Sequence, residues 1–229
     1  MIRLLALSFI ILLSLSACTS TRFGIDSSLF TEEPCKAPCW QKLIPGQSTN
    51  QDVEEFLTNL SATEWPGRRM HNYESGCVQI RVTDAISSEE VRAALDFNIE
   101  ADKLTFIQSD HPEMPKLQEI TDHFGKPEYI KAVLAVGPDG SLYILEVYYP
   151  SKGVAFTLSP NQDDIDYIRP DMQIDAIQYF ATGDLLSYFT VRYSCDIGQQ
   201  SASKLAQDQI SKYIQPWSGY GKVKVIPNQ

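Results

Sequence analysis

Apolar residues recur at helical spacing shortly after a Pro45-Gly46 turn. Thr49 stands where a helix N-cap would accept backbone hydrogen bonds, and Asp52 lies in the first turn that follows. The apolar positions after this cap are three or four residues apart, and they are Val53, Phe56, Leu57 and Leu60. The pattern predicts an amphipathic helix with one face against a core.

A strand and a hairpin are expected next. Residues 77–82 (CVQIRV) alternate between apolar and polar, which is typical of a half-buried strand. Residues 91–108 alternate in the same way on both sides of Ala101-Asp102, which predicts a hairpin that turns there. A short helix over residues 87–95 is the alternative, because two serines followed by two glutamates can form a helix cap.

A second helix followed by strands is predicted further along the chain. Leu117, Ile120 and Phe124 share a helix face, and Gly125 with Pro127 ends it. The strands expected after it are residues 129–136 and 142–149, which flank the Gly-Pro-Asp-Gly turn at 137–140, then 153–158 and 172–180. A C-terminal helix is expected over residues 201–214, whose apolar positions are only loosely periodic.

The order of these predicted elements along the chain indicates a helix followed by antiparallel strands, and then the same arrangement a second time. We therefore expect an α+β fold of two tandem helix-plus-antiparallel-sheet units, which form one mostly antiparallel sheet with helices packed on it. The expected divisions are a leader at 1–17, a tether at 18–33, a first unit at 34–110, a second unit at 111–193 and a C-terminal helix and tail at 194–229.

The first residues have the layout of a secretory signal peptide. Arg3 is followed by an apolar run from Leu4 to Leu15 that carries no charge. This run is shorter than the roughly 20 residues that a membrane-spanning helix needs. We expect an exported protein.

Leu15-Ser16-Ala17-Cys18 resembles the lipobox of bacterial lipoproteins. The resemblance implies cleavage between Ala17 and Cys18, and acylation of Cys18 on its thiol and its freed amine. The acyl chains would anchor the protein to the extracytoplasmic face of a lipid bilayer, either a cell membrane or an outer membrane. The alternative is an ordinary signal peptide whose cysteine later enters a disulfide.

Four further cysteines are Cys35, Cys39, Cys77 and Cys195. An even number in an exported chain favours disulfides, and three pairings are open. A metal site is the weaker interpretation. The spacing of Cys35 and Cys39 is one residue too long for a zinc knuckle, and neither Cys77 nor Cys195 has a second ligand nearby.

Charge and motifs narrow the function. The chain has 19 Lys plus Arg against 29 Asp plus Glu, a net charge of -10, so it lacks the basic footprint of a nucleic-acid-binding protein. It contains no Gly-x-Ser-x-Gly, His-Glu-x-x-His or Walker motif. His111 beside Asp110 and Glu113, and the aspartates at 163, 164 and 166, fit solvated loops better than metal sites. We therefore expect no catalytic residue, metal or cofactor.

Aromatic residues gather at two places, Tyr148-Tyr149 and Trp217 with Tyr220. These residue types are enriched at binding surfaces, which makes the four residues candidates for contact with a partner. The alternative is that one residue of the strand pair packs in the core and the tail docks on the sheet.

The helix that ends in Phe124-Gly125-x-Pro127, together with Pro45-Gly46 followed by Thr49 and Val53, resembles the SmpA/OmlA (BamE-like) family of small lipoproteins. The same plan is similar to the tandem units of β-lactamase inhibitory protein. Both resemblances imply a non-catalytic fold whose sheet face or edge binds another protein. We expect a non-enzymatic protein-binding or envelope-assembly module. An envelope solute- or glycan-binding lipoprotein is the alternative.

Overall fold

The structure is a computed structural model that describes residues 28–60, 67–72, 76–87, 90–110, 114–137, 140–159 and 166–228. The expected leader, cleavage site and acylated Cys18 lie outside these residues. His111 and Glu113 of the first acidic loop do so too, as do Asp163 and Asp164 of the second.

The first half contains the predicted helix, strand and hairpin. Thr49 caps the helix in a capping box with Asp52, and the hairpin turns at Ala101-Asp102. The alternative short helix over residues 87–95 is wrong, because strand β3 already begins at Glu90. The elements are α2 (Ser28–Thr31), α3 (Asn50–Asn59), β1 (Gly67–Asn72), β2 (Cys77–Ser87), β3 (Glu90–Glu100) and β4 (Lys103–Asp110).

The second half adds a helical hairpin that the sequence analysis predicted only in part. The second of its helices, α6, corresponds to the expected C-terminal helix, whereas α5 was not predicted. The elements are α4 (Leu117–Phe124), β5 (Tyr129–Gly137), β6 (Gly140–Tyr149), η1 (Pro150–Lys152), β7 (Val154–Leu158), β8 (Tyr167–Ile168), β9 (Ile174–Phe180), α5 (Leu185–Ile197), α6 (Gln199–Tyr213), β10 (Ile214–Pro216), β11 (Gly221–Lys222) and β12 (Ile226–Asn228).

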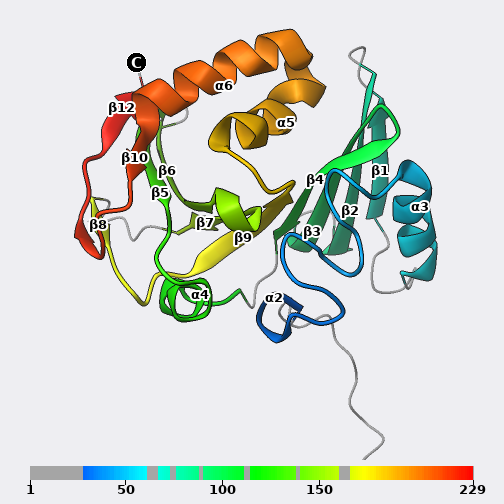
Figure 1. Cartoon of the computed structure of the whole chain (residues 1–229), viewed down its shortest axis with the longest axis horizontal. Helices are drawn as coiled ribbons and strands as arrows, with labels where there is room; N and C mark the ends of the chain where they lie inside the picture. Colours follow the sequence, from blue (N-terminus) through cyan, green and yellow to red (C-terminus); the bar gives the residue numbers. More distant parts are fainter. Residues whose placement is uncertain are drawn as a thin grey trace, which may run out of the picture.

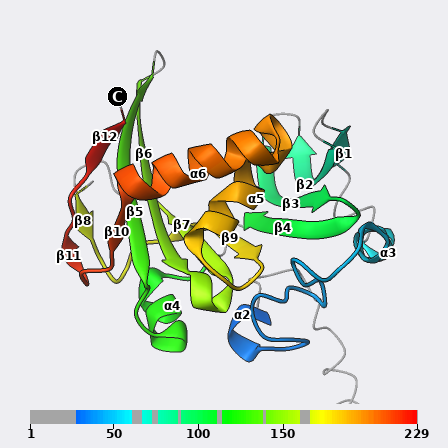
Figure 2. The ribbon, with the colours of Figure 1, turned by 45° about the horizontal axis from the view of Figure 1, so that its top comes forward.

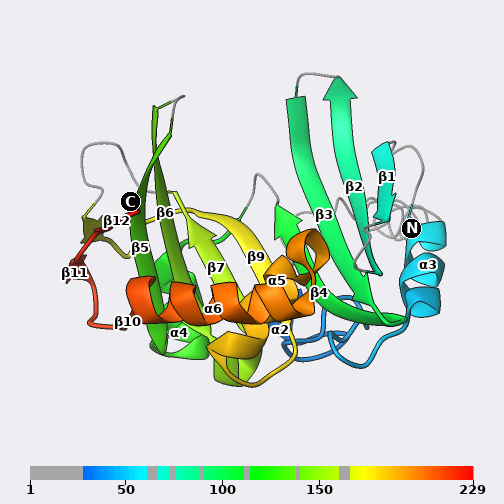
Figure 3. The same ribbon diagram turned by 90° about the horizontal axis from the view of Figure 1, so that it is seen from above.

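One mostly antiparallel sheet runs through the described part of the chain in the order β1-β2-β3-β4-β9-β7-β6-β5-β10. β12 pairs with β5 in parallel, and β11 forms a separate pair with β8. Figure 1 shows that the sheet is strongly curved, with α5 and α6 on its concave side and α2, α3 and α4 on its convex side. Figures 2 and 3 show α6 crossing in front of the concave face. The α+β class is therefore as predicted.

The two faces of the sheet differ in chemistry. Side chains on the convex face are apolar and form the larger core cluster with the helices that cover them, and examples are Ile80, Val82, Phe97, Ile107, Phe156, Ile177 and Val147. A smaller cluster, which includes Phe106, Tyr148, Phe180, Tyr188 and Phe189, lies between the concave face and the α5–α6 hairpin. Burial of the smaller cluster holds the α5–α6 hairpin on the concave face, and burial of the larger one holds α2, α3 and α4 on the convex face.

Helix α2 lies inside the stretch that was expected to be a tether up to residue 33. Leu29 is buried and belongs to the larger core cluster, and the partly buried Phe30 packs against that cluster. An apolar side chain that leaves water is worth roughly 1.5 to 3 kcal/mol. Residues 28–33 are therefore part of the folded domain, so a tether would have to end before Ser28.

Each half of the sheet is tied to its own helix by the same contacts. The N-cap Thr49 of α3 bridges to Lys103 at the start of β4, and the N-cap Lys116 of α4 bridges to Gln173, just before β9. Asn50 and Leu117, which follow the two N-caps, each donate a backbone hydrogen bond to the residue that precedes the bridge partner, Asp102 and Met172 respectively. β4 and β9 then pair with each other and join the two halves.

Candidate binding face on the concave side of the sheet

The concave face carries a row of polar and charged side chains that crosses the sheet from β1 to β5. The register places these side chains on one face because partners in neighbouring strands point the same way. The row consists of Arg69, His71, Gln79, Arg81, Asp96, Asn98, Gln108, Asp110, Gln178, Thr157, Glu146 and Lys131. Helix α5 covers its middle part, and its β1–β2 end is open.

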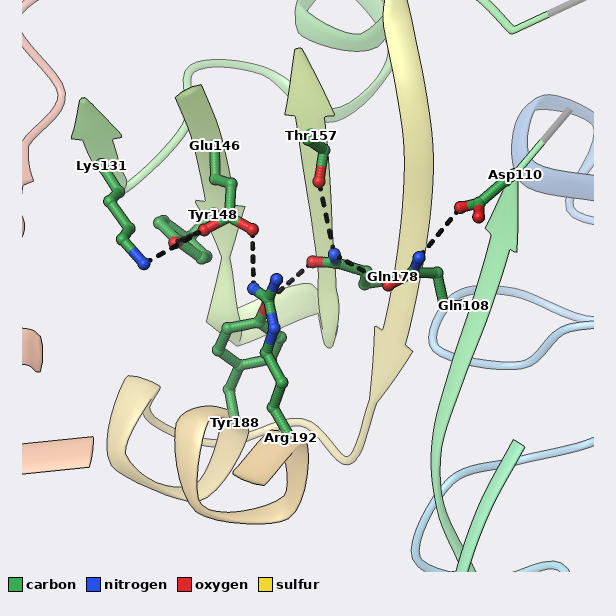
Figure 4. Close-up of polar contacts among 9 residues, drawn as sticks. All are labelled: Gln108, Asp110, Lys131, Glu146, Tyr148, Thr157, Gln178, Tyr188 and Arg192. Atoms are coloured by element: carbon green, nitrogen blue, oxygen red, sulfur yellow. Dashed lines mark hydrogen bonds and ion pairs between the residues drawn. The ribbon is translucent and has the colours of Figure 1, made fainter. Parts of the chain in front are cut away.

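Glu146 is the centre of the covered part, which Figure 4 shows as sticks. Only 1% of its side chain is exposed. One carboxylate oxygen accepts a hydrogen bond of 2.6 Å from Arg192 Nη1 on α5. The other accepts one of 2.7 Å from the Tyr148 hydroxyl and lies 3.7 Å from Lys131 Nζ. Two cations and a phenol therefore surround one buried carboxylate.

The network continues from α5 across the sheet toward β4. Arg192 donates to the Tyr188 hydroxyl at 2.7 Å, and that hydroxyl donates to Gln178 Oε1 at 2.6 Å. Gln178 Nε2 donates to Gln108 Oε1 at 3.3 Å, and Gln108 Nε2 donates to Asp110 Oδ1 at 3.0 Å (Figure 4). The side chains of this network, from Arg192 on α5 to Asp110 on β4, thus satisfy one another.

Burial and neighbouring charges shift the pKa values of Glu146 and Lys131 in this network. Burial by itself raises the pKa of Glu146, but Arg192 and Lys131 outweigh it, and the pKa lies below the usual range of a glutamate. Burial lowers the pKa of Lys131, although Glu146 opposes the effect. A carboxylate held ionised between two cations has no proton to give and little tendency to take one. The arrangement fixes α5 on the sheet and is poorly suited to acid–base catalysis.

The open end of the polar row forms a hollow of about 500 Å³ on β1 and β2, lined by Arg69, Met70, His71, Gln79 and Arg81. Arg69 and His71 are exposed, and half of the Arg81 side chain is exposed. Arg81 Nη1 lies 3.6 Å from Asp96 Oδ2 on β3. This part of the sheet presents the guanidinium groups to solvent, whereas the partly buried Gln79 donates from Nε2 to Asn98 Oδ1 at 3.4 Å.

Asp96 and Asp110 lie diagonally across β3 and β4 behind the hollow. Burial raises the pKa of Asp96 to about 6. The charge of Arg81 opposes this rise, and the charge of Asp110 adds to it. Burial also raises the pKa of Asp110, although its hydrogen bond from Gln108 opposes this. The Oδ1 atom of Asp96 is buried and lacks a hydrogen-bond partner within the described chain. The charge of Asp96 therefore changes at mildly acidic pH.

The four aromatic candidates separate into two environments. Tyr148 and Tyr149 are both buried, on opposite faces of β6, so neither ring reaches the surface. The Tyr149 hydroxyl donates to Gly125 O at 2.9 Å. Both tyrosines are thus core residues, whereas the alternative given in the sequence analysis placed only one of them in the core.

Trp217 and Tyr220 lie together on the surface beside α4. Their rings meet edge to face with centroids 5.8 Å apart, and the Tyr220 hydroxyl lies 2.6 Å from Thr121 Oγ1. Tyr220 is 40% exposed, whereas Trp217 is partly buried against the larger core cluster. The tail docks on the fold through these two residues, and Tyr220 is the one that solvent reaches most.

A second hollow lies where the α5–α6 hairpin meets the edge of the sheet. Its walls are mostly apolar and include Tyr129, Leu186, Ile210, Ile214 and Pro216. It has a volume of about 410 Å³. Neither this hollow nor the one on β1 and β2 is lined by any of the four aromatic candidates.

The four described cysteines form two disulfides, Cys35–Cys39 and Cys77–Cys195, with Cα atoms 5.7 and 5.0 Å apart. The second bond joins the start of β2 to α5. Within the described ranges, no group of three His, Cys, Asp or Glu side chains is placed to hold a metal ion. No helix in the described part of the chain has the length and apolarity to cross a membrane.

The hollow on β1 and β2 was not predicted from the sequence. Its signal was the pattern Arg69-Met70-His71 facing Gln79-Ile80-Arg81, in which polar residues alternate with apolar ones. β1 was not expected as a strand, so its residues could not be paired with β2. Comparison with protein-family models, with curated proteins and with solved structures finds no match to this chain.

Proposed function

We propose that this protein is a lipid-anchored, extracytoplasmic and non-enzymatic module that binds another protein on the open end of its concave sheet face. The observation that carries the proposal is the hollow on β1 and β2, where Arg69, His71, Gln79 and Arg81 face solvent beside an edge strand. Interfaces are enriched in arginine, and an edge strand offers unpaired backbone groups to a partner.

The covered part of the same face supports a binding role over an enzymatic one. Its most buried charged group, Glu146, is fully engaged with Arg192, Tyr148 and Lys131, and α5 lies over it. Such a network gives a rigid platform, which lowers the entropy lost on binding. The solute- or glycan-binding alternative is less well supported, since the four aromatic candidates line neither of these two hollows in the part of the chain that the structure describes.

We further infer that the domain is a tandem repeat of two helix-plus-sheet units, α3 with β1–β4 and α4 with β5, β6, β7 and β9. The support is the matching set of backbone contacts at the two helix N-caps, Thr49 with Lys103 and Lys116 with Gln173. The strand order also fits two copies. From each outer side of the sheet toward its middle, the strands follow in chain order, β1-β2-β3-β4 and β5-β6-β7-β9, and the last strand of each copy joins the other.

The lipid anchor is tested with the Cys18→Ser variant and a clickable palmitate analogue fed to cells of the native host. The native chain should take up the label and sediment with membranes, and the variant should lose both properties. Equal labelling of the two proteins would reject the anchor at Cys18. The rest of the proposal concerns the folded domain and is tested separately.

The binding face is tested by photo-crosslinking in intact cells, with p-benzoylphenylalanine in place of Gln79 in the hollow. The matched control carries the same probe in place of Leu142, which is 63% exposed on β6. One protein adduct of defined mass from position 79, absent from position 142, is the expected result. Identical adduct patterns at both positions, or none from position 79, would reject the proposed face.

A further inference from the structure

Two arginines stand directly opposite each other at the open end of the concave face. Arg69 on β1 pairs in register with Arg81 on β2, so both side chains project from the same side of the antiparallel pair. Side chains in this relation start only about 5 Å apart at Cβ, and like charges placed so are destabilising. A protein with a net charge of -10 therefore concentrates two positive charges on adjacent strands of one small area.

Among the residues that the structure describes, this pair is neutralised only in part. Asp96 is the next residue across the sheet, and it reaches Arg81 at 3.6 Å. Within the described part of the chain, Arg69 has no carboxylate within ion-pair distance. Asp96 is itself 8% exposed, and its Oδ1 atom has no hydrogen-bond partner there. One carboxylate thus pairs with Arg81, whereas Arg69 one strand further out has no such partner among the described residues.

The surroundings of the two arginines favour a small anionic group. The hollow of about 500 Å³ is lined by both guanidinium-bearing residues together with His71 and Gln79, whose side chains can also donate hydrogen bonds. A guanidinium presents a planar fork that matches the two oxygens of a carboxylate or phosphate. Two such forks on neighbouring strands can hold one oxyanion from two sides.

We propose that the hollow is an oxyanion-binding site, in which Arg69 and Arg81 clamp a carboxylate or phosphate group and His71 and Gln79 contact its rim. The inference rests on the proposed function, because the oxyanion would belong to the partner that occupies this face. A bound anion supplies the charge that Asp96 alone does not, and it lets Arg69 exchange repulsion for a charge-assisted hydrogen bond.

The test is an NMR titration of the full chain purified in detergent, with the arginine Nε–H signals as the readout. The probes are a tetraglutamate peptide, glycerol 3-phosphate and, as a charge control, a tetralysine peptide. At least one anionic probe should shift the Arg69 and Arg81 signals in a saturable manner, and tetralysine should not. Tighter binding of tetraglutamate identifies the oxyanion as a protein carboxylate, and tighter binding of glycerol 3-phosphate identifies it as a phosphate.

Variants separate this site from general charge. Arg69→Gln should weaken the anionic probe about 10-fold or more, which is the loss expected for one charge-assisted contact. Arg69→Lys keeps the charge but loses the planar fork, so its affinity for the anionic probe should lie between that of the native chain and that of Arg69→Gln. Lys204→Gln, which removes an exposed cation on α6, should leave the affinity unchanged.

The inference is overturned if neither anionic probe shifts the two arginine signals, or if Lys204→Gln weakens binding as much as Arg69→Gln. These outcomes are distinct from failure of the proposed function. A specific adduct from position 79 without anion binding would keep the protein-binding face and reject the clamp. Anion binding without any adduct would keep the clamp and reject a protein as its partner.

Discussion

Arg192 on α5 donates a 2.6 Å hydrogen bond to Glu146 on β6, and the Glu146 side chain is only 1% exposed. The bond joins the helical hairpin to the polar face of the sheet. Lys131 lies on the other side of the same carboxylate, with 6% of its side chain exposed. A buried carboxylate and a buried ammonium therefore lie against a partly exposed guanidinium, and the removal of the carboxylate leaves the two cations without compensation.

Replacement of Glu146 by Gln should lower the free energy of unfolding by about 3 to 5 kcal/mol, the range expected when one partner of a buried ion pair is removed. Lys131 and Arg192 would then repel each other in a poorly hydrated site. Urea denaturation followed by circular dichroism measures the loss. Glu55→Gln on the exposed side of α3 is the matched control and should change stability by less than about 0.5 kcal/mol. A loss below about 1 kcal/mol for Glu146→Gln would show that the network does not hold α5 in place.

The Cys77–Cys195 disulfide should contribute far more to stability than the Cys35–Cys39 disulfide. The residues of the first bond are 118 apart in sequence and those of the second only 4. Loop-closure entropy then predicts about 5 kcal/mol for the long loop and about 2 kcal/mol for the short one. Denaturation of Cys77→Ala/Cys195→Ala and Cys35→Ala/Cys39→Ala, both under oxidising conditions, tests the order. A larger loss in the second double variant would contradict the prediction.

Asp96 should make the protein less stable as pH rises from about 4 to about 6. Burial raises the pKa of Asp96 from 3.8 to about 6. Arg81 on β2 lowers this pKa, and Asp110 on β4 raises it further. Between these values the folded state keeps a proton that the unfolded state has lost, so the free energy of unfolding falls as pH rises and levels off above about 6. The total fall from this residue is on the order of 2 to 3 kcal/mol.

The Asp96→Asn variant isolates this contribution. Its stability relative to the native chain should be near zero at pH 4 and should increase by roughly 2 kcal/mol by pH 8, because the amide never ionises. Denaturant titrations at pH 4, 6 and 8 measure the trend. Asp208→Asn, at an exposed position on α6, is the matched control. A gain for Asp96→Asn that is equal at all three values would assign the effect to packing.

Local signals in the sequence were sufficient for the elements whose apolar face meets the larger core. Helix α3 has its apolar stripe at Val53 and Leu57 and a capping box at Thr49, and the hairpin of β3 and β4 alternates regularly. Each of these patterns repeats at the period of its element, because one side packs on apolar residues and the other meets water.

Helix α5 escaped prediction because it packs on the polar face. Tyr188, Arg192 and Ser194 point toward buried polar partners or the sheet, so its apolar residues form no clean stripe. Its start and end were nevertheless marked, since Asp184 caps it through the Ser187 amide and Gly198 follows it with φ at +74°. The open arginine pair required the β1–β2 register, which one strand's own sequence does not specify.

Gly153, which follows η1, should tolerate no side chain. Its φ of +69° is the left-handed conformation, and a Cβ there would lie 2.4 Å from Phe180 O and 2.7 Å from Pro38 Cβ. Two variants separate the two costs, because Gly76 has φ +82° with open space and Gly183 has open space without a positive φ. Gly183→Ala should be nearly neutral and Gly76→Ala should lose about 1 kcal/mol.

Gly153→Ala should therefore lower the free energy of unfolding by about 3 kcal/mol. The new Cβ adds backbone strain and also pushes the Pro38 loop away from the end of β9. Thermal and urea denaturation of the three variants give the comparison. A loss for Gly153→Ala no greater than that for Gly76→Ala would mean that Pro38 and its disulfide-bonded loop move aside freely. The loop would then be only loosely attached to the core, although Trp40 directly after it is 2% exposed.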